Sequence, residues 1–279
     1  MDTKKTAVGT HDTAVGTHKK QQHKPVVELA PLLPHGQLEA VFDNIWMVTG
    51  QMNMPMSIKM TMSRNMTIVR NPDTQTLCLI NTVRLSEAGL QALDALGKVT
   101  TVIRLAGYHG RDDAFFQQHY GAKVYAIEGQ VYAREMDVHK NDYEPYMQPD
   151  VWMKNTDDLP LDNAQLHLLA GAHPPEAVLL LEQNEGVLVA GDCLQNMAKP
   201  DEYVNFPMRI MMRLSGFFKA FNVGPFWLKL AKPNKSAVRS LLELDFEHVL
   251  PAHGDPVLNA AKRKYAPVIN GDLRGGREA

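Results

Sequence analysis

The chain has 279 residues, of which 44% are hydrophobic and 22% are charged, so it can bury a sizeable core. The net charge of −2 gives no general electrostatic attraction for nucleic acid, and we expect no nucleic-acid partner. The sequence contains no run of about 18 apolar residues, so no membrane span is predicted. No apolar segment typical of a signal peptide follows the polar first residues. We therefore expect a cytoplasmic protein.

The first 24 residues are polar and contain two copies of the hexapeptide Thr-Ala-Val-Gly-Thr-His. Two such short copies cannot bury a core, so the composition predicts a disordered tail over residues 1–24. A weak metal-binding tract that uses His11, His18 and His23 is the alternative interpretation. We expect one folded domain over residues 25–279.

Structured patterns begin after the tail. Ser86 is a typical helix N-cap, Leu90, Leu93 and Leu96 share one helical face, and Gly97 predicts the end of that helix. A second helix is predicted over 113–120. Apolar and alternating runs predict strands over 41–48, 65–70, 77–81, 99–105 and 123–126.

The second half of the chain repeats this organisation. Its patterns predict strands over 165–169, 177–182, 186–190 and 248–251, and helices over 235–244 and from residue 259. Groups of strands alternating with helices favour two packed sheets with helices outside. The pattern alone does not decide between an α/β and an α+β arrangement.

The cysteine content points to a reducing compartment. Cys78 and Cys193 both lie in apolar runs, and two cysteines are too few for a disulfide framework. We expect buried, reduced thiols.

Four separate loops present a histidine or an aspartate close to the end of a predicted strand. Imidazole and carboxylate groups are ligands that zinc, iron and manganese accept, and sites are commonly built on such loops. Any one of these residues also has an ordinary interpretation as a surface or turn residue. The combination and its order favour a metal site formed by His109, Asp113, His173, Asp192 and His253.

The same order resembles the metallo-β-lactamase superfamily over roughly residues 37–268. That family has a His-x-His-x-Asp-His motif, a loop with a further histidine, a Gly-Asp pair after a strand and a last strand that ends in His-Gly. Here Asp192 follows Gly191, and His253 precedes Gly254, in the expected places. The resemblance implies an α/β fold, an αββα sandwich of two mixed β-sheets flanked by helices.

The first motif departs from the family pattern. If Asp113 takes the family's aspartate position, His109 takes the first histidine, Arg111 replaces the second and Ala114 replaces the last. The resemblance then implies metal ligands at His109, Asp113, His173, Asp192 and His253. One ion is expected, zinc or else iron or manganese, and none if the site has degenerated. The fixed charge of Arg111 would repel a second cation and could hold a substrate anion.

The implied function is a metal-dependent hydrolase. It would cleave an ester, thioester or phosphoester of a small-molecule substrate by metal-activated water, with Asp113 as the catalytic residue that orients the water or accepts its proton. The alternatives are a non-catalytic ligand-binding protein that kept the fold and lost the metal site, and a non-haem iron redox protein.

Two further segments carry a compositional signal. Methionines crowd one stretch, where they either fill the core or form the apolar wall of a substrate pocket: Met47, Met52, Met54, Met56, Met60, Met62 and Met66. Residues 207–232 combine basic and aromatic side chains without an acidic one. This second segment favours a lid over the site or a subunit contact in a homodimer, rather than insertion into a membrane surface.

Overall fold

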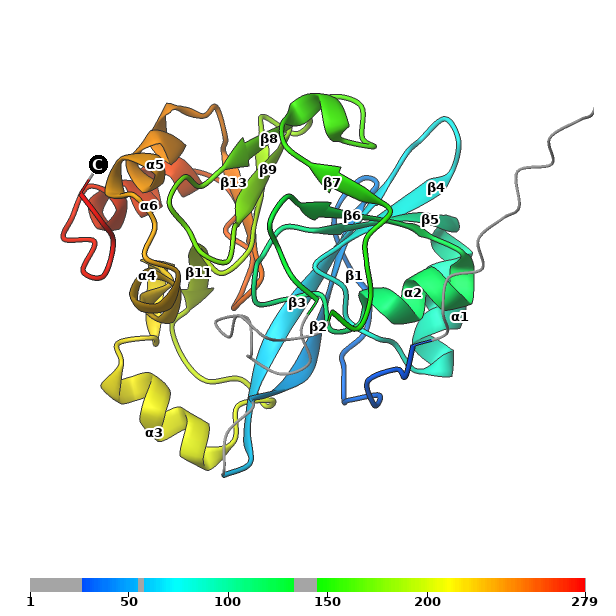
Figure 1. The fold of residues 1–279 in the computed structure, drawn as a ribbon, viewed down its shortest axis with the longest axis horizontal. Coiled ribbons are helices and arrows are strands. Elements are labelled where there is room, and N and C mark those ends of the chain that lie inside the picture. The colour runs from blue at the N-terminus through cyan, green and yellow to red at the C-terminus, as the bar shows by residue number, and fades with distance from the viewer. Residues whose placement is uncertain (1–26, 55–57, 133–144, 279) are drawn as a thin grey trace, which may run out of the picture.

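Two mixed β-sheets pack against each other, and helices cover their outer sides (Figure 1). The computed structural model describes residues 27–54, 58–132 and 145–278, so the predicted tail over 1–24 lies outside the described residues. The αββα sandwich and the α/β class predicted from the resemblance are confirmed.

The first sheet has seven strands in chain order. Its first four strands are antiparallel and its last four are parallel, so β4 belongs to both halves. The strands are β1 (Glu39–Phe42), β2 (Ile45–Met54), β3 (Met60–Arg70), β4 (Thr76–Ile80), β5 (Lys98–Arg104), β6 (Lys123–Ile127) and β7 (Val151–Met153).

The second sheet has four strands in the order β13-β10-β9-β8, and only the β10–β13 pair is parallel. A separate antiparallel pair, β11 and β12, lies beside it. The strands of these two sheets are β8 (Ala164–Leu168), β9 (Ala177–Leu181), β10 (Val187–Ala190), β11 (Leu194–Met197), β12 (Lys219–Val223) and β13 (His248–Pro251).

Helices α1 and α2 lie on the outer side of the seven-stranded sheet, and α4 to α6 lie on the side of the other sheet (Figure 1). Ser86 caps α1 as predicted, since its hydroxyl accepts a hydrogen bond from the Gly89 amide. The helices are α1 (Glu87–Leu96), α2 (Asp113–Tyr120), α3 (Phe206–Leu214), α4 (Pro225–Ala231), α5 (Lys235–Arg239) and α6 (Ala261–Ile269), with 3₁₀ turns at Thr156–Asp158 and Ser240–Glu243.

Two predicted boundaries are wrong. The strand predicted over 41–48 is a hairpin, because Asn44 has φ = 62° and turns the chain between β1 and β2. Asparagine tolerates this left-handed conformation, so a tight turn can form within the mostly apolar run 41–48 that predicted one strand. The helix predicted over 235–244 ends at Arg239 and continues as a 3₁₀ turn.

The main core lies between the two sheets. Ile45, Ile80 and Ile103 of the first sheet share one buried cluster with Leu179 and Val189 of the second. Cys78 is buried in this cluster and Cys193 in a neighbouring one, and both thiols are free, as predicted. No helix in the described part of the chain is long and apolar enough to cross a membrane.

Truncation of Leu179 tests this sheet-to-sheet core. Leu179 lies on β9 with no exposed surface, so Leu179→Ala should lower the free energy of unfolding by about 2–5 kcal/mol in urea denaturation. Leu168→Ala on the adjacent strand β8 is the matched control, since Leu168 is 44% exposed, and its loss should stay below about 0.5 kcal/mol. Equal losses would contradict this assignment of the core.

Candidate metal centre

Strand pairing brings Asp192 and His253 together. In the parallel pair β10–β13, Ala190 lies opposite Pro251, and the two functional residues each follow by two positions. Parallel strands end at the same edge of a sheet, so the two loops leave the sheet side by side. The site therefore begins with two neighbouring loops of one sheet.

His109 reaches the same place from the other sheet, in the loop after β5. Two side chains hold the first part of that loop. Arg104, buried at the end of β5, donates hydrogen bonds to the carbonyl oxygens of Ala106 and Gly107. Asn81 accepts from the Ala106 amide. These bonds satisfy backbone groups that burial would otherwise leave unpaired, and they fix the path of the loop toward His109.

The three side chains form a compact group with one carboxylate and two imidazoles. One ligand atom of each of His109, Asp192 and His253 lies within 4.8 Å of the other two. Asp192 Oδ1 lies 2.9 Å from His253 Nε2 and 3.4 Å from His109 Nε2. Zinc–ligand bonds of about 2.0–2.2 Å place neighbouring ligand atoms roughly 3.3–3.6 Å apart, so the separations are close to those of a tetrahedral site.

The hydrogen bonds of His253 favour a cation at this point. Nδ1 lies 2.8 Å from the carbonyl oxygen of Ser63, so Nδ1 must carry a proton and donate it to that oxygen. In the neutral ring, Nε2 then presents a lone pair toward the Asp192 carboxylate. Two electron-rich atoms at hydrogen-bonding distance need a proton or a metal ion between them. Metal-bound histidines are commonly oriented by such a second hydrogen bond.

Unpaired polar atoms support the same conclusion. Among the described residues, neither ring nitrogen of His109 has a hydrogen-bond partner, and neither does Asp192 Oδ2, although all three atoms are buried. Buried polar atoms without partners are rare because each loses its hydration without replacement. A metal ion bound by His109, Asp192 and His253 would satisfy such atoms, so the donor set fits a divalent cation.

Burial and neighbouring charges set the protonation states of this group. Burial lowers the pKa of His109, although Asp192 opposes that shift, so the ring is neutral and can act as a ligand. Burial alone would raise the pKa of Asp192, but the two imidazoles lower it well below its usual range. Glu176, buried beside Asp192, has a pKa raised by burial and by the Asp192 charge, and both effects favour its neutral form. Glu176 accepts a hydrogen bond from the Cys193 amide and so holds the Asp192 loop.

The other residues predicted as ligands lie outside the group of three. Asp113 is fully buried, and its two oxygens accept hydrogen bonds from Thr82 at 2.5 Å and from Tyr132 at 2.7 Å. His173 contributes no atom to the group found among the described residues. Their predicted roles as ligands, and that of Asp113 in catalysis, stay predictions that this geometry does not favour.

Arg111, predicted to bind substrate, points to the N-terminal segment. Its guanidinium donates to the Pro31 carbonyl oxygen at 3.4 Å. Burial lowers its pKa, an effect opposed by Asp112. The buried arginine next to the site is instead Arg64 on β3, which forms an ion pair with Asp112. Sequence reasoning missed Arg64 because it lies just before the strand predicted over 65–70, with no motif around it.

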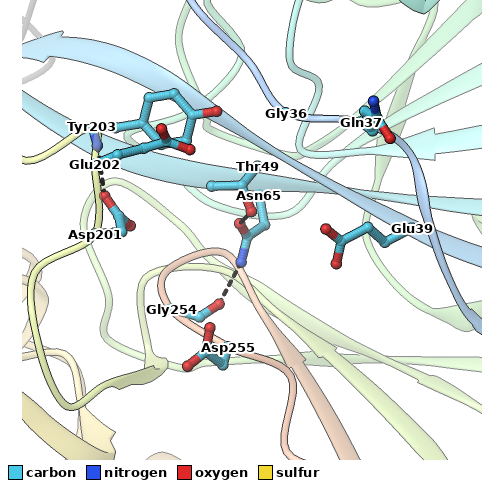
Figure 2. Close-up of a pocket in the computed structure, with 10 residues that line it drawn as sticks. All are labelled: Gly36, Gln37, Glu39, Thr49, Asn65, Asp201, Glu202, Tyr203, Gly254 and Asp255. Carbon is cyan, nitrogen blue, oxygen red and sulfur yellow. Dashed lines mark hydrogen bonds between the residues drawn. The ribbon is translucent and has the colours of Figure 1, made fainter.

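Asn65 on β3 is a second residue that the sequence did not reveal. Its side-chain amide donates to the carbonyl oxygens of Pro251 and Gly254, and its backbone amide donates to Ala252. Thr49 donates to Asn65 Oδ1 at 2.8 Å and fixes the orientation of the amide. Asn65 and Gly254 also line a neighbouring polar cavity, and Figure 2 shows the hydrogen bond between them there. Asn65 thus holds the loop that carries His253 from both sides.

A larger cavity of about 390 Å³ opens directly over the three ligands. Its wall comes from the β2–β3 hairpin and from the segment that includes α3 and α4. Residues 207–232 therefore cover the site, as the lid interpretation expects. The cavity is lined by His109, Asp192, His253, Tyr108, Gln195, Gly224, Met52, Met54, Met62, Met211, Phe217, Phe226, Trp227 and Leu230.

Known structures share this architecture, although comparison of the sequence alone finds no related family or protein. No protein-family model matches the chain, and no curated protein sequence does. The metallo-β-lactamase FIM-1 from Pseudomonas aeruginosa, solved in a mono-zinc form, is 14% identical with a TM-score of 0.53, over 86% of this chain and 96% of FIM-1. The structure of VMB-1 is 12% identical with a TM-score of 0.54, over 84% and 96% of the two chains.

A metallo-β-lactamase from Hirschia baltica is 15% identical with a TM-score of 0.51, over 84% of this chain and 97% of that one. These matches cover nearly the whole length of each known structure. The two mixed sheets, flanked by helices and carrying a histidine–aspartate site at their edge, thus define an αββα protein. Its fold is that of the metallo-β-lactamases.

Loss of the Asn65 amide should displace His253. Asn65→Ala leaves the buried carbonyl oxygen of Pro251 and the partly buried one of Gly254 without this donor, so the free energy of unfolding should fall by about 1–3 kcal/mol and metal affinity should fall with it. Asn53→Ala, on the exposed face of β2, is the control and should change neither quantity. Thermal melting and metal titration measure both, and an Asn65→Ala variant with normal metal affinity would contradict the positioning role.

Proposed function

We propose that this chain is a metal-dependent hydrolase that holds one divalent cation at His109, Asp192 and His253. The observation that carries the proposal is the convergence of three buried ligands, with atoms that lack other partners, at the end of a cavity of substrate size. Three protein ligands with a remaining open position are typical of catalytic zinc sites. A mono-zinc form of FIM-1, which has the same fold, supports a single zinc ion here.

A bound cation would supply Lewis acidity, which polarises the oxygen of an ester, thioester or phosphoester and makes water a better nucleophile at neutral pH. The chain's own groups orient this chemistry. The low pKa of Asp192 keeps it anionic as a ligand, while burial and the Asp192 charge raise the pKa of Glu176 and disfavour a second negative charge beside it. Burial raises the pKa of Tyr108, so its phenol on the cavity wall stays protonated.

A non-haem iron protein is the second candidate. Two histidines and one carboxylate also form the ligand set of non-haem iron(II) oxygenases, and this composition is the observation that favours it. Elemental analysis separates the two candidates, since the hydrolase is expected to contain zinc and the redox protein iron.

Metal content tests the ligand assignment. Purified protein, dialysed briefly without chelator, should contain about one equivalent of metal. His109→Ala, Asp192→Ala and His253→Ala should each lose metal and hydrolytic activity together, because each removes a ligand from the group of three.

Two variants serve as controls for that experiment. Arg111→Ala should keep the metal, because its guanidinium does not line the cavity. Asp113→Asn tests the role predicted from the sequence: retained metal with lower stability would agree with its contacts to Thr82 and Tyr132. If Asp192→Ala and His253→Ala both keep the wild-type metal content, the site assignment is wrong.

Removal of the metal should lower stability, because a ligand that binds only the folded state stabilises it. At a free metal concentration about 100 times the dissociation constant, the stabilisation is about 2.7 kcal/mol. Chelation should therefore lower the thermal midpoint of the wild-type protein and leave that of Asp192→Ala unchanged. An equal decrease in both proteins would show that the chelator acts elsewhere.

A further inference from the structure

The cavity over the metal centre has a polar end and a long apolar wall. The polar end consists of the three ligands together with Tyr108 and Gln195. Eight of the remaining lining side chains are methionine, phenylalanine, tryptophan or leucine: Met52, Met54, Met62, Met211, Phe217, Phe226, Trp227 and Leu230. A substrate that fills this cavity must present a reactive polar group at one end and apolar surface along the rest.

Two separate elements build the apolar wall. On the β2–β3 hairpin, Met52 lies directly opposite Met62. On the other side, Phe217 and Phe226 are in contact, with ring centroids 5.5 Å apart. The Phe217 ring also lies 6.1 Å from the ring of His253, so the apolar wall continues to the ligand itself.

The charges of the lining distinguish between the substrate classes. Among the described residues that line the cavity, Asp192 is the one with a fixed charge, and none is a lysine or an arginine. A phosphoester would have the proposed metal ion as its one positive partner, and the Asp192 carboxylate already offsets part of that charge, so burying a phosphate anion is costly here. An uncharged carbonyl group carries no such cost. The lining therefore disfavours a phosphoester and favours a carboxylic ester or thioester.

We propose that the cavity binds the unbranched hydrocarbon chain of an acyl ester or thioester, with the acyl carbonyl at the metal centre. This inference rests on the proposed hydrolase function. Hydrolysis would add hydroxide from water to the acyl carbon and a proton to the departing alcohol or thiol, so no oxidant or further reactant is needed. Methionine side chains are unbranched and flexible and fill irregular gaps, so this wall can adapt its shape to a hydrocarbon chain.

Binding of linear alcohols tests the cavity without any catalysis. The series from 1-butanol to 1-decanol, titrated calorimetrically into protein kept metal-free with chelator, should bind more tightly with each added methylene. Burial of a methylene increases affinity about three- to fourfold, until the cavity is filled. An affinity that does not change with chain length would overturn the proposal.

Two positions on helix α3 provide a matched pair of variants. Met211 lines the cavity, whereas Ile210 is 48% exposed and does not line it. Met211→Gln, which keeps the length of the side chain, should weaken 1-decanol binding roughly five- to tenfold. Ile210→Gln should bind as the wild type does. Equal weakening by both would overturn the proposal, and Met54→Gln on the opposite wall repeats the test if Met211→Gln fails to fold.

Ester hydrolysis then separates failure of this inference from failure of the hydrolase proposal. Metal-loaded protein should cleave 4-nitrophenyl decanoate with a higher kcat/KM than 4-nitrophenyl acetate, and Met211→Gln should lower the ratio of the decanoate value to the acetate value, whereas Ile210→Gln should leave that ratio unchanged. If decanol binds but neither ester is cleaved, the cavity assignment stands and the hydrolase proposal fails. If both esters are cleaved equally well and no alcohol binds, the hydrolase stands and the hydrocarbon-chain inference is overturned.

Discussion

The carboxylate of Asp192, buried between two imidazoles, is the constraint on which the rest of the site depends. A buried carboxylate is costly unless positive charge or hydrogen-bond donors compensate it. His109 follows β5 of the first sheet and His253 follows β13 of the second, and a cation bound between these rings and Asp192 would supply the compensating charge. The packing of the two sheets is therefore coupled to the site, because any change in their separation would expose the Asp192 charge to a less favourable environment. A cation bound by the three residues would strengthen this coupling.

Strand β3 aligns the loop after β13 of the opposite sheet and the loop after β5 of its own sheet. Three consecutive residues do this work: the Ser63 carbonyl orients His253, Arg64 pairs with Asp112, and Asn65 holds the backbone on both sides of His253. Gly254 allows that backbone path, since it has φ = 87° and a Cβ there would lie 2.1 Å from the Asn196 carbonyl oxygen. Because the strand is rigid, its contacts with the loop that carries His253 give the precise placement that metal ligands require.

The sequence predicted the elements whose signals are local. Asp192 and His253 were predictable because each follows a short apolar strand, and His109 because it follows another. Asp113 shows the limit of this reasoning, since its partners Thr82 and Tyr132 are 31 and 19 residues away along the chain and lie in segments without a motif. Alignment to the family motif placed Asp113 among the ligands, whereas packing directs both of its oxygens to these two hydroxyl groups. Contacts across the fold, such as those of Arg64 and Asn65, leave no periodic signal in the sequence.

The methionine-rich stretch shows how one compositional signal carries two meanings. Met47 and Met66 are buried in core clusters, as the core interpretation expects, while Met52 and Met62 line the cavity. Met56 lies outside the described residues. Cross-strand register explains the division, because the residues paired at the end of β2 and the start of β3 extend past the sheet-to-sheet core and meet α3 and Phe217 instead. The same apolar wall lowers the dielectric constant beside the buried ligands. In a medium of lower dielectric constant, the interaction of Asp192 with a cation and the polarisation of a bound carbonyl group are both stronger than in water. The residues that favour an apolar substrate in the proposed hydrolase would therefore also create the electrostatic conditions that hydrolysis of that substrate needs.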